Sequence, residues 1–183
     1  NLDKHIINNM PKISNRGERI PASPIRKLTP FSDAAKAKGV KVYHLNIGQP
    51  DLPAPQKALD TLKHISRPTL EYSPSQGLRS FREKLSGYYR RFGINVSEKE
   101  IIVTAGGSEA LLLTFLACLN PGDEIITTEP GYANYISFAI TAGVTVKAVT
   151  SHIENGFALP SVEEFEKAIT EKTKAILIGN PNN

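Results

Sequence analysis

Residues 101–128, IIVTAGGSEALLLTFLACLNPGDEIITT, decide the fold class of this chain. The β-branched run at 101–104 predicts a strand, and two glycines then turn the chain into an apolar helix over 109–119. The turn residues at 120–123, Asn-Pro-Gly-Asp, end that helix, and a second strand is expected over 124–128. A strand, a helix and a strand at this spacing predict a right-handed βαβ unit with parallel strands.

The same alternation continues on both sides of this unit. Ser161 and Glu164 form a capping-box pattern at the start of one helix. The helices expected elsewhere span 31–38, 56–65, 77–92, 132–141 and 161–170, and the strands span 42–47, 144–149 and 174–178. Residues 10–32 are rich in Pro, Ser and Arg and are expected to form an extended arm. The predicted fold is therefore α/β, a mostly parallel sheet flanked by helices and preceded by an N-terminal arm.

Composition excludes several classes of protein. The 183 residues are 40% hydrophobic and 22% charged, fractions typical of a globular chain. No apolar run approaches the roughly 18 residues of a membrane span, so we expect a soluble protein without a membrane partner. The net charge is +4, but the basic residues are scattered along helix faces, a pattern that does not favour nucleic-acid binding.

Three features of the sequence bear on the cellular compartment of the protein and on whether it binds a metal: its cysteine, its histidines and its N-terminus. Cys118 is the single cysteine and lies in an apolar run, so it is interpreted as a small core residue in a reducing compartment. The four histidines lack metal-ligand spacing, so no metal site is expected. Residues 1–9 have no secretory pattern and are interpreted as a leader before a natural start at Met10. A cytoplasmic protein is expected.

Three loops that follow predicted strands carry residues suited to binding a ligand. Gly106-Gly107-Ser108 precedes a helix, where free backbone N–H groups and a hydroxyl can bind a phosphate. Tyr132 begins the next helix and could stack on a planar ring, and residues 179–183 offer asparagine amides. Taken alone, the Gly106 loop is better explained as an ordinary turn with a serine cap, Tyr132 equally well as a core or capping residue, and Asn-Pro is common in any turn. All three lie at the carboxyl ends of parallel strands, where α/β proteins bind ligands.

Five segments, in the same order along the chain, resemble a known family. They are 45–51 (LNIGQPD), 72–77 (YSPSQG), 103–110 (VTAGGSEA), 121–124 (PGDE) and 180–183 (NPNN). The chain resembles the class I/II pyridoxal-phosphate aminotransferases of fold type I, and most closely the bacterial aspartate aminotransferases. The last segment resembles the start of the family motif Asn-Pro-x-Asn-Pro-Thr-Gly. The resemblance covers nearly all of the chain after Met10.

The resemblance implies pyridoxal 5′-phosphate as cofactor and assigns residues to it. Gly106, Gly107 and Ser108 match the loop that binds the cofactor phosphate. Tyr132 matches the aromatic residue, often Trp, that lies against the pyridine ring. Asn183 matches the asparagine that donates to the cofactor's 3-oxygen and also lines the substrate site.

Two further residues are assigned to the neighbouring subunit and to the substrate. Tyr72 matches the tyrosine whose hydroxyl reaches the phosphate in the neighbouring subunit, which implies a homodimer. Gly48 matches the glycine whose backbone approaches the substrate α-carboxylate. Residues 10–49 would then be the arm and the start of the small domain, and 50–183 the first part of the cofactor-binding large domain.

The family's Schiff-base lysine, its pyridine-pairing aspartate and its carboxylate-binding arginine lie downstream of the Asn-Pro motif. This segment is therefore expected to be incomplete, without a catalytic residue, and inactive alone. The complete enzyme is expected to move an amino group from aspartate, or a similar amino acid, to 2-oxoglutarate. The alternatives are alanine, aromatic or aminocyclopropane-carboxylate chemistry on the same scaffold. Lower-ranked alternatives are the sensor domain of a transcription regulator and a non-catalytic nucleotide-binding α/β module.

Overall fold

The computed structural model of the chain describes residues 12–66 and 68–180. The chain divides into two compact units, of which unit 1 combines residues up to Val40 with those from Gly107 onward, and unit 2 is Lys41–Gly106. The leader predicted at 1–9 and the cofactor contact predicted at Asn183 lie outside the described residues. Unit 1 contains the sheet, and unit 2 is helical in the part that the structure describes.

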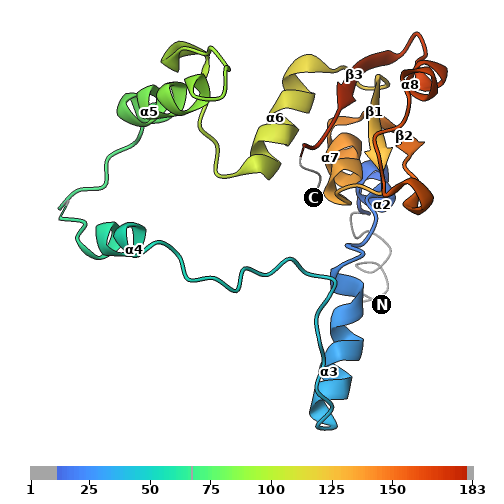
Figure 1. Cartoon of the computed structure of the whole chain (residues 1–183), viewed down its shortest axis with the longest axis horizontal. Helices are drawn as coiled ribbons and strands as arrows, with labels where there is room; N and C mark the ends of the chain where they lie inside the picture. The colour runs from blue at the N-terminus through green and yellow to red at the C-terminus, as the bar shows by residue number, and fades with distance from the viewer. Residues whose placement is uncertain (1–11, 67, 181–183) are drawn as a thin grey trace, which may run out of the picture. The chain divides into compact units, whose positions relative to one another are not determined.

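Unit 1 is organised around a three-stranded parallel sheet (Figure 1). Its strands are β1 (Glu124–Glu129), β2 (Thr145–Thr150) and β3 (Thr173–Leu177), in the order β2-β1-β3. On the central strand, Ile125 lies opposite Val146 of β2 and Ala175 of β3. The predicted parallel α/β arrangement is confirmed, because each pair of consecutive strands is joined through a helix.

The described helices of unit 1 lie before and between these strands along the chain. Those of the N-terminal region are α2 (Asn15–Arg19), the 3-10 helix η1 (Arg26–Leu28) and α3 (Thr29–Ala37). Those around the sheet are α6 (Gly107–Cys118), α7 (Asn134–Ala142), the 3-10 helix η3 (Ile153–Asn155) and α8 (Val162–Ala168). Within 12–66 and 68–180, none of the helices has the length and apolar character needed to cross a membrane.

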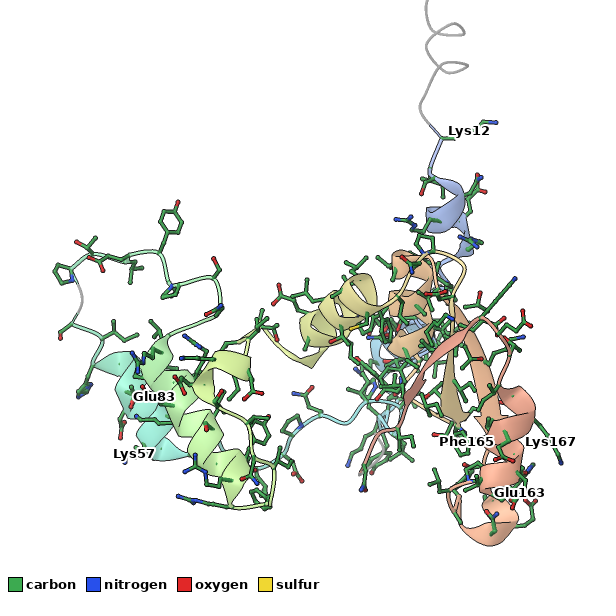
Figure 2. The ribbon with its side chains drawn as sticks, turned by 90° about the horizontal axis from the view of Figure 1, so that it is seen from above. Lys12, Lys57, Glu83, Glu163, Phe165 and Lys167 are labelled. Carbon is green, nitrogen blue, oxygen red and sulfur yellow. The ribbon has the colours of Figure 1, made fainter. Side chains whose placement is uncertain are left out.

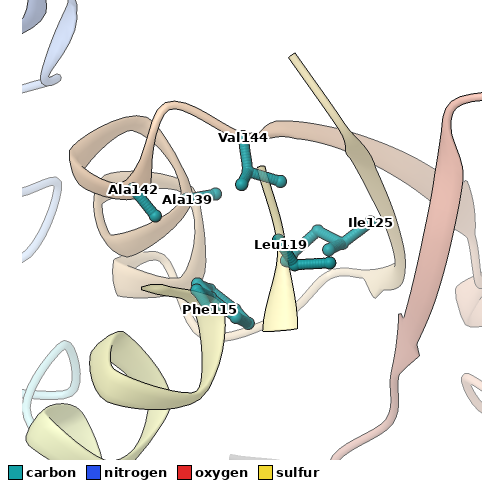
Figure 3. Close-up of a cluster of buried hydrophobic side chains, with 6 residues drawn as sticks. All are labelled: Phe115, Leu119, Ile125, Ala139, Ala142 and Val144. Atoms are coloured by element: carbon teal, nitrogen blue, oxygen red, sulfur yellow. The ribbon is translucent and has the colours of Figure 1, made fainter. Parts of the chain in front are cut away.

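The core of unit 1 lies on both faces of β1, since successive strand residues point to opposite sides. On one face Ile125 is fully buried with side chains from α6, α7 and the start of β2 (Figure 3), namely Phe115, Leu119, Ala139, Ala142 and Val144. On the other face Ile126 packs with Val149 and with Phe165 of α8. Figure 2 shows Phe165 on the sheet side of α8 and Lys167 on its outer side.

Helix α8 is held at its start by the capping box that the sequence predicts. Ser161 Oγ accepts a hydrogen bond from the Glu164 backbone N–H at 3.4 Å, and the Ser161 N–H donates to the Glu164 carboxylate at 2.8 Å. These bonds satisfy two N–H groups that a helix start leaves without intrahelical partners. The cap thereby fixes the position from which Phe165 enters the core.

Unit 2 contains α4 (Gln56–Lys63), α5 (Arg79–Arg90) and the 3-10 helix η2 (Glu98–Glu100). The apolar periodicity predicts α5 correctly, but its buried residues are Arg82 and Ser86, while Leu78 and Phe81 are nearly half exposed. Ser86 Oγ donates to the Val96 carbonyl at 2.6 Å. Helix α5 therefore binds the chain that follows it through polar groups.

Two predicted strands are wrong. Residues 42–47 and 101–104 belong to none of the described strands. Ile101 is extended, with φ −111° and ψ 127°, and the Val103 N–H donates to the Gln76 carbonyl at 3.0 Å. A β-rich composition produces a strand only where a neighbouring strand supplies a hydrogen-bonded ladder. The segment from Ile101 pairs with a turn instead.

Two smaller expectations also need correction. The arm at 10–32 is not wholly extended, since Ser14 Oγ caps the short helix α2 by accepting a hydrogen bond from the Gly17 N–H at 3.1 Å, and η1 follows.

Cys118, expected in the core, is exposed. Helix α6 is apolar on all sides but turns only the face of Phe115 and Leu119 into the core, which leaves Cys118 outside it.

Candidate functional site

Two glycines lie in the turn between residues 104 and 108, directly before and at the start of α6. Thr104 Oγ1 donates to the Gly106 carbonyl at 2.9 Å, and α6 begins at Gly107. A Cβ added to either glycine would meet nothing within 4 Å, and neither has a left-handed φ. The backbone therefore does not require glycine here. Without side chains at Gly106 and Gly107, a ligand can come close to the positive dipole end of α6, a favourable place for an anion.

Tyr132 lies in the loop that follows β1, and its neighbours hold its ring. The preceding turn has a cis Glu129–Pro130 bond, and a Cβ on Gly131 would lie 2.7 Å from the Thr128 carbonyl oxygen. The half-buried Tyr132 accepts a hydrogen bond from Asn134 Nδ2 at its hydroxyl, at 2.7 Å. The Tyr135 ring lies 5.4 Å away at 87°. A tyrosine held at both its hydroxyl and its ring is suited to contact a planar ligand.

The loops after β1 and β3 are tied together at the same edge of the sheet. Thr127, which is buried, donates a hydrogen bond from its hydroxyl to the Leu177 carbonyl at 2.9 Å. Leu177 is the last residue of β3, and the exposed Asn180 follows it by three positions. Carboxyl ends of parallel strands are where α/β proteins bind ligands. In unit 1 the loops after β1 and β3 leave the sheet at the same edge, and the convergence of all three loops stays a prediction.

A cavity of about 350 Å³ lies at this edge. Its lining comes from the ends of all three strands and from the chain after β2, and consists of Thr128, Pro130, Ser151, Phe157, Leu159, Ile178, Gly179 and Asn180. The Ser151 N–H donates to the Glu129 carbonyl at 2.6 Å, and Thr150 Oγ1 donates to the Glu129 carboxylate at 2.7 Å. These bonds hold the end of β2 against the end of β1, so the edge is built from both strands.

The remaining predicted residues belong to unit 2 or lie outside the described residues. A Cβ on Gly48 would meet nothing within 4 Å, so its backbone is as open as that of Gly106. Tyr72 is fully exposed, which leaves its hydroxyl accessible to another molecule. The structure thus places Gly107, Ser108, Tyr132 and Asn180 in unit 1 and Gly48, Tyr72 and Gly106 in unit 2.

Sequence reasoning missed two residues that hold others in place. Asn134 fixes the hydroxyl of Tyr132, and its position two residues after an aromatic at a helix start was the available signal. Arg82 is 8% exposed in the middle of α5. Its spacing of four from both Leu78 and Ser86 placed it on one face of the helix with them, but a charged residue at such a position is ordinarily expected in solvent.

Two exposed carboxyl groups outside this edge have lowered pKa values. The pKa of Glu100 lies below its usual value because the Ser97 backbone N–H, and then the Ser97 hydroxyl, donate to the carboxylate. The pKa of Glu163 is lowered by its own backbone N–H and then by the Ser161 hydroxyl. Both belong to helix caps and stabilise structure. Across residues 12–66 and 68–180, no group of three His, Cys, Asp or Glu side chains is arranged to hold a metal.

Comparison with known proteins identifies the class of protein to which this fold belongs. The family model described as aminotransferase class I and II matches residues 40–183. The chain therefore belongs to the aminotransferase class I and II family. Its parallel sheet with flanking helices matches part of the fold type I aminotransferase large domain.

Named relatives and solved structures agree with this assignment. The chain is 34% identical over 173 residues to an aspartate aminotransferase of Thermotoga maritima, covering 93% of this chain and 46% of the relative. It is 35% identical over 150 residues to an aspartate/prephenate aminotransferase of Thermus thermophilus, with coverage of 81% and 39%. The chain thus spans less than half the length of these curated relatives.

Two solved structures show the similarity in three dimensions. The aspartate aminotransferase of Thermotoga maritima superposes with a TM-score of 0.86 at 34% identity, covering 93% of this chain and 46% of the other. An alanine aminotransferase from Pyrococcus furiosus has a TM-score of 0.83 at 30% identity, with coverage of 90% and 43%. Aminotransferases that are named for different amino acids, aspartate and alanine, therefore share this part of the fold.

Proposed function

We propose that this chain is the N-terminal part of a pyridoxal-phosphate-dependent aminotransferase that acts as a homodimer. The complete enzyme would move an amino group from aspartate, or a similar amino acid, to 2-oxoglutarate. The observation that carries the proposal is the turn at Gly106 and Gly107, where the backbone does not require glycine and an added Cβ would meet nothing within 4 Å at the start of α6. A phosphate group fits this turn because its charge is complementary to the helix N-terminus.

Different residues of the chain would bind different parts of the cofactor. Backbone N–H groups of Gly106 and Gly107 and the hydroxyl of Ser108 would bind its phosphate. Tyr132, held by Asn134, would lie against its ring, and Asn183 would donate a hydrogen bond to its 3-oxygen. When bound, pyridoxal phosphate supplies an electron sink for chemistry at the substrate Cα.

Gly48 would contact the substrate, and Tyr72 would contact the cofactor bound in the neighbouring subunit. The open backbone at Gly48 would approach the α-carboxylate of the amino acid. The exposed hydroxyl of Tyr72 would reach the phosphate in the other subunit, so that each active site would contain residues of both copies. In this proposal residues 10–49 form the arm and start of the small domain, and 50–183 the first part of the large domain.

The segment alone is proposed to be inactive, since none of its lysines matches the family's Schiff-base lysine, which transamination requires as a covalent partner and proton carrier. The test compares the isolated segment with the complete polypeptide, each supplied with pyridoxal phosphate, aspartate and 2-oxoglutarate. We expect sustained oxaloacetate formation from the complete polypeptide only. Turnover by the isolated segment would contradict its inactivity, and no turnover with any amino donor would contradict the aminotransferase assignment.

The amino donor has named alternatives. Relatives of this chain include an LL-diaminopimelate aminotransferase at 33% identity and an alanine aminotransferase at 30%. The same scaffold therefore accommodates several substrates, and fold similarity does not select among them. Parallel assays with alanine and aromatic amino acids decide this point, and we expect the highest kcat/KM for aspartate. A localisation in the cytoplasm remains part of the proposal.

A further inference from the structure

Arg82 of α5 is buried although it carries a positive charge, with 8% of its surface exposed. Its Nε donates to the Gly77 carbonyl at 3.2 Å, and its Nη1 donates to the Glu98 carbonyl. Both acceptors are backbone oxygens of segments outside the helix. Because a guanidinium holds its donors in a fixed planar array, two such bonds set the positions of both segments relative to α5.

The segment that ends at Gly77 is a tight turn packed onto the chain at Val103. The Gly77 N–H donates to the Pro74 carbonyl at 2.8 Å, and Gly77 has a φ of +92°. The Val103 N–H donates to the Gln76 carbonyl at 3.0 Å, and a Cβ on Gly77 would lie 2.6 Å from the Val103 Cβ. The turn and the extended segment at Val103 are thus in direct contact, with Arg82 bonded to the turn's last carbonyl.

Arg82 thus binds the turn that follows Tyr72 and the residues at Glu98, and the bond from Val103 to Gln76 joins that turn to the segment leading to Gly106. Tyr72 lies two residues before Pro74, and Gly106 lies three residues after Val103. We propose that Arg82 is a positioning residue that fixes the Pro74–Gly77 turn, called the Tyr72 turn because Tyr72 precedes it, against the segment leading to Gly106. Arg82 thereby couples the phosphate contact that Tyr72 would make in the neighbouring subunit to the phosphate contact that Gly106 would make in its own subunit. This inference rests on the proposed function, since the roles of Tyr72 and Gly106 come from it.

The test measures the dissociation constant for pyridoxal phosphate by absorbance titration of the complete polypeptide. Arg82→Met is expected to weaken binding about tenfold, the usual effect of losing a charge-assisted hydrogen bond. Arg82→Lys, which keeps the charge but places its donors on a single nitrogen, should weaken binding less. If Arg82 acts through the Tyr72 turn, the double variant Arg82→Met/Tyr72→Phe will weaken binding by less than the product of the two single effects.

Ser86→Ala provides the matched control on the same buried face of α5. It removes a hydrogen bond to Val96 but leaves the Tyr72 turn untouched. We expect Ser86→Ala to lower thermal stability without changing cofactor affinity. If Arg82 had only a structural role, Arg82→Met would likewise lower thermal stability and leave cofactor affinity unchanged. Unchanged affinity in Arg82→Met, or effects that multiply fully with Tyr72→Phe, would overturn the inference.

A second measurement separates this inference from the proposed function. Hydrogen exchange of the Gly77 and Val103 amides should accelerate in Arg82→Met and remain as in the wild type in Ser86→Ala, with or without cofactor. If the wild-type polypeptide binds no cofactor, both the proposed function and the coupling role of Arg82 are wrong. Hydrogen exchange of the Gly77 and Val103 amides then still tests whether Arg82 holds the turn in place. If Arg82→Met does not fold, Arg82→Lys carries both measurements, and wild-type behaviour in both contradicts the inference.

Discussion

The Thr127 hydroxyl donates a 2.9 Å hydrogen bond to the Leu177 carbonyl and so ties the end of β1 to the end of β3. Thr127 and Leu177 are paired in register, and Thr127 is buried. The loop that carries Tyr132 begins three residues after Thr127, and Asn180 follows Leu177 by the same number. One side chain inside the sheet therefore determines how closely two loops of the candidate site approach each other.

Thr127→Val should destabilise unit 1 by about 1 kcal/mol, since valine keeps the shape and leaves the Leu177 carbonyl without its donor. Thr145→Val, at an exposed position of β2, is the matched control and should change the free energy of unfolding by less than about 0.5 kcal/mol. Urea denaturation measures both variants. Equal midpoints for the two would show that the bond contributes nothing.

Gly77→Ala should destabilise unit 2 by about 2 kcal/mol, because Gly77 has a left-handed φ and its added Cβ would clash with Val103. Gly87 lies inside α5 with open space around it, so Gly87→Ala should stabilise the helix by up to about 1 kcal/mol. Thermal unfolding followed by circular dichroism compares them. A shift of the same sign in both variants would contradict the geometry of the turn.

The cap at Ser97 and Glu100 should weaken in acid. The pKa of Glu100 is lowered in the folded chain, first by the Ser97 backbone N–H and then by its hydroxyl. A lowered folded pKa means that the cap stabilises η2 fully above the unfolded value of about 4.3, and that this stabilisation is lost as the pH falls through the folded value. Carboxyl chemical shifts measured by NMR give the titration. Ser97→Ala should move the Glu100 pKa back toward its usual value, and an ordinary pKa in the wild type would refute the cap.

Asn134→Ala should weaken binding of pyridoxal phosphate about fivefold in the complete polypeptide, the effect of one neutral hydrogen bond. The reason is that the Tyr132 hydroxyl loses the amide that holds it at 2.7 Å. In a Tyr132→Phe background the hydroxyl is already gone, so Asn134→Ala should then have no further effect. Absorbance titration of the four proteins provides the comparison, and a full effect in the Phe background would mean that Asn134 acts elsewhere.

Much of unit 1 could be predicted from the sequence because its signals are local. The strands β1, β2 and β3 and the helices between them appear where apolar periodicity and turn residues place them, with boundaries shifted by up to about three residues. The Ser161–Glu164 capping box is likewise a pattern within four residues of chain. The two glycines at the start of α6 could also be identified from the sequence, because they directly precede an apolar helical run, although the strand predicted before them does not form.

What could not be predicted depends on contacts between distant segments. Ile101 to Thr104 has strand composition, but its partner is the Gln76 turn, which no local pattern indicates. The burial of Arg82 depends on two carbonyls, one of them 16 residues away, and the sequence alone predicts a solvated arginine. The roles of Tyr72 and Gly48 came from resemblance alone, since an exposed tyrosine and an open glycine have no distinctive local signal.

The central claim is that the turn at Gly106 to Ser108 holds the phosphate of pyridoxal phosphate, and one titration tests it most directly. Adding the cofactor to the complete polypeptide should produce an absorbance band near about 410–430 nm that borohydride removes. Ser108→Ala, which removes one phosphate donor, should weaken cofactor binding about tenfold, with the same band at saturation. A wild-type polypeptide that develops no band, or a Ser108→Ala variant that binds the cofactor as tightly as wild type, would contradict the claim.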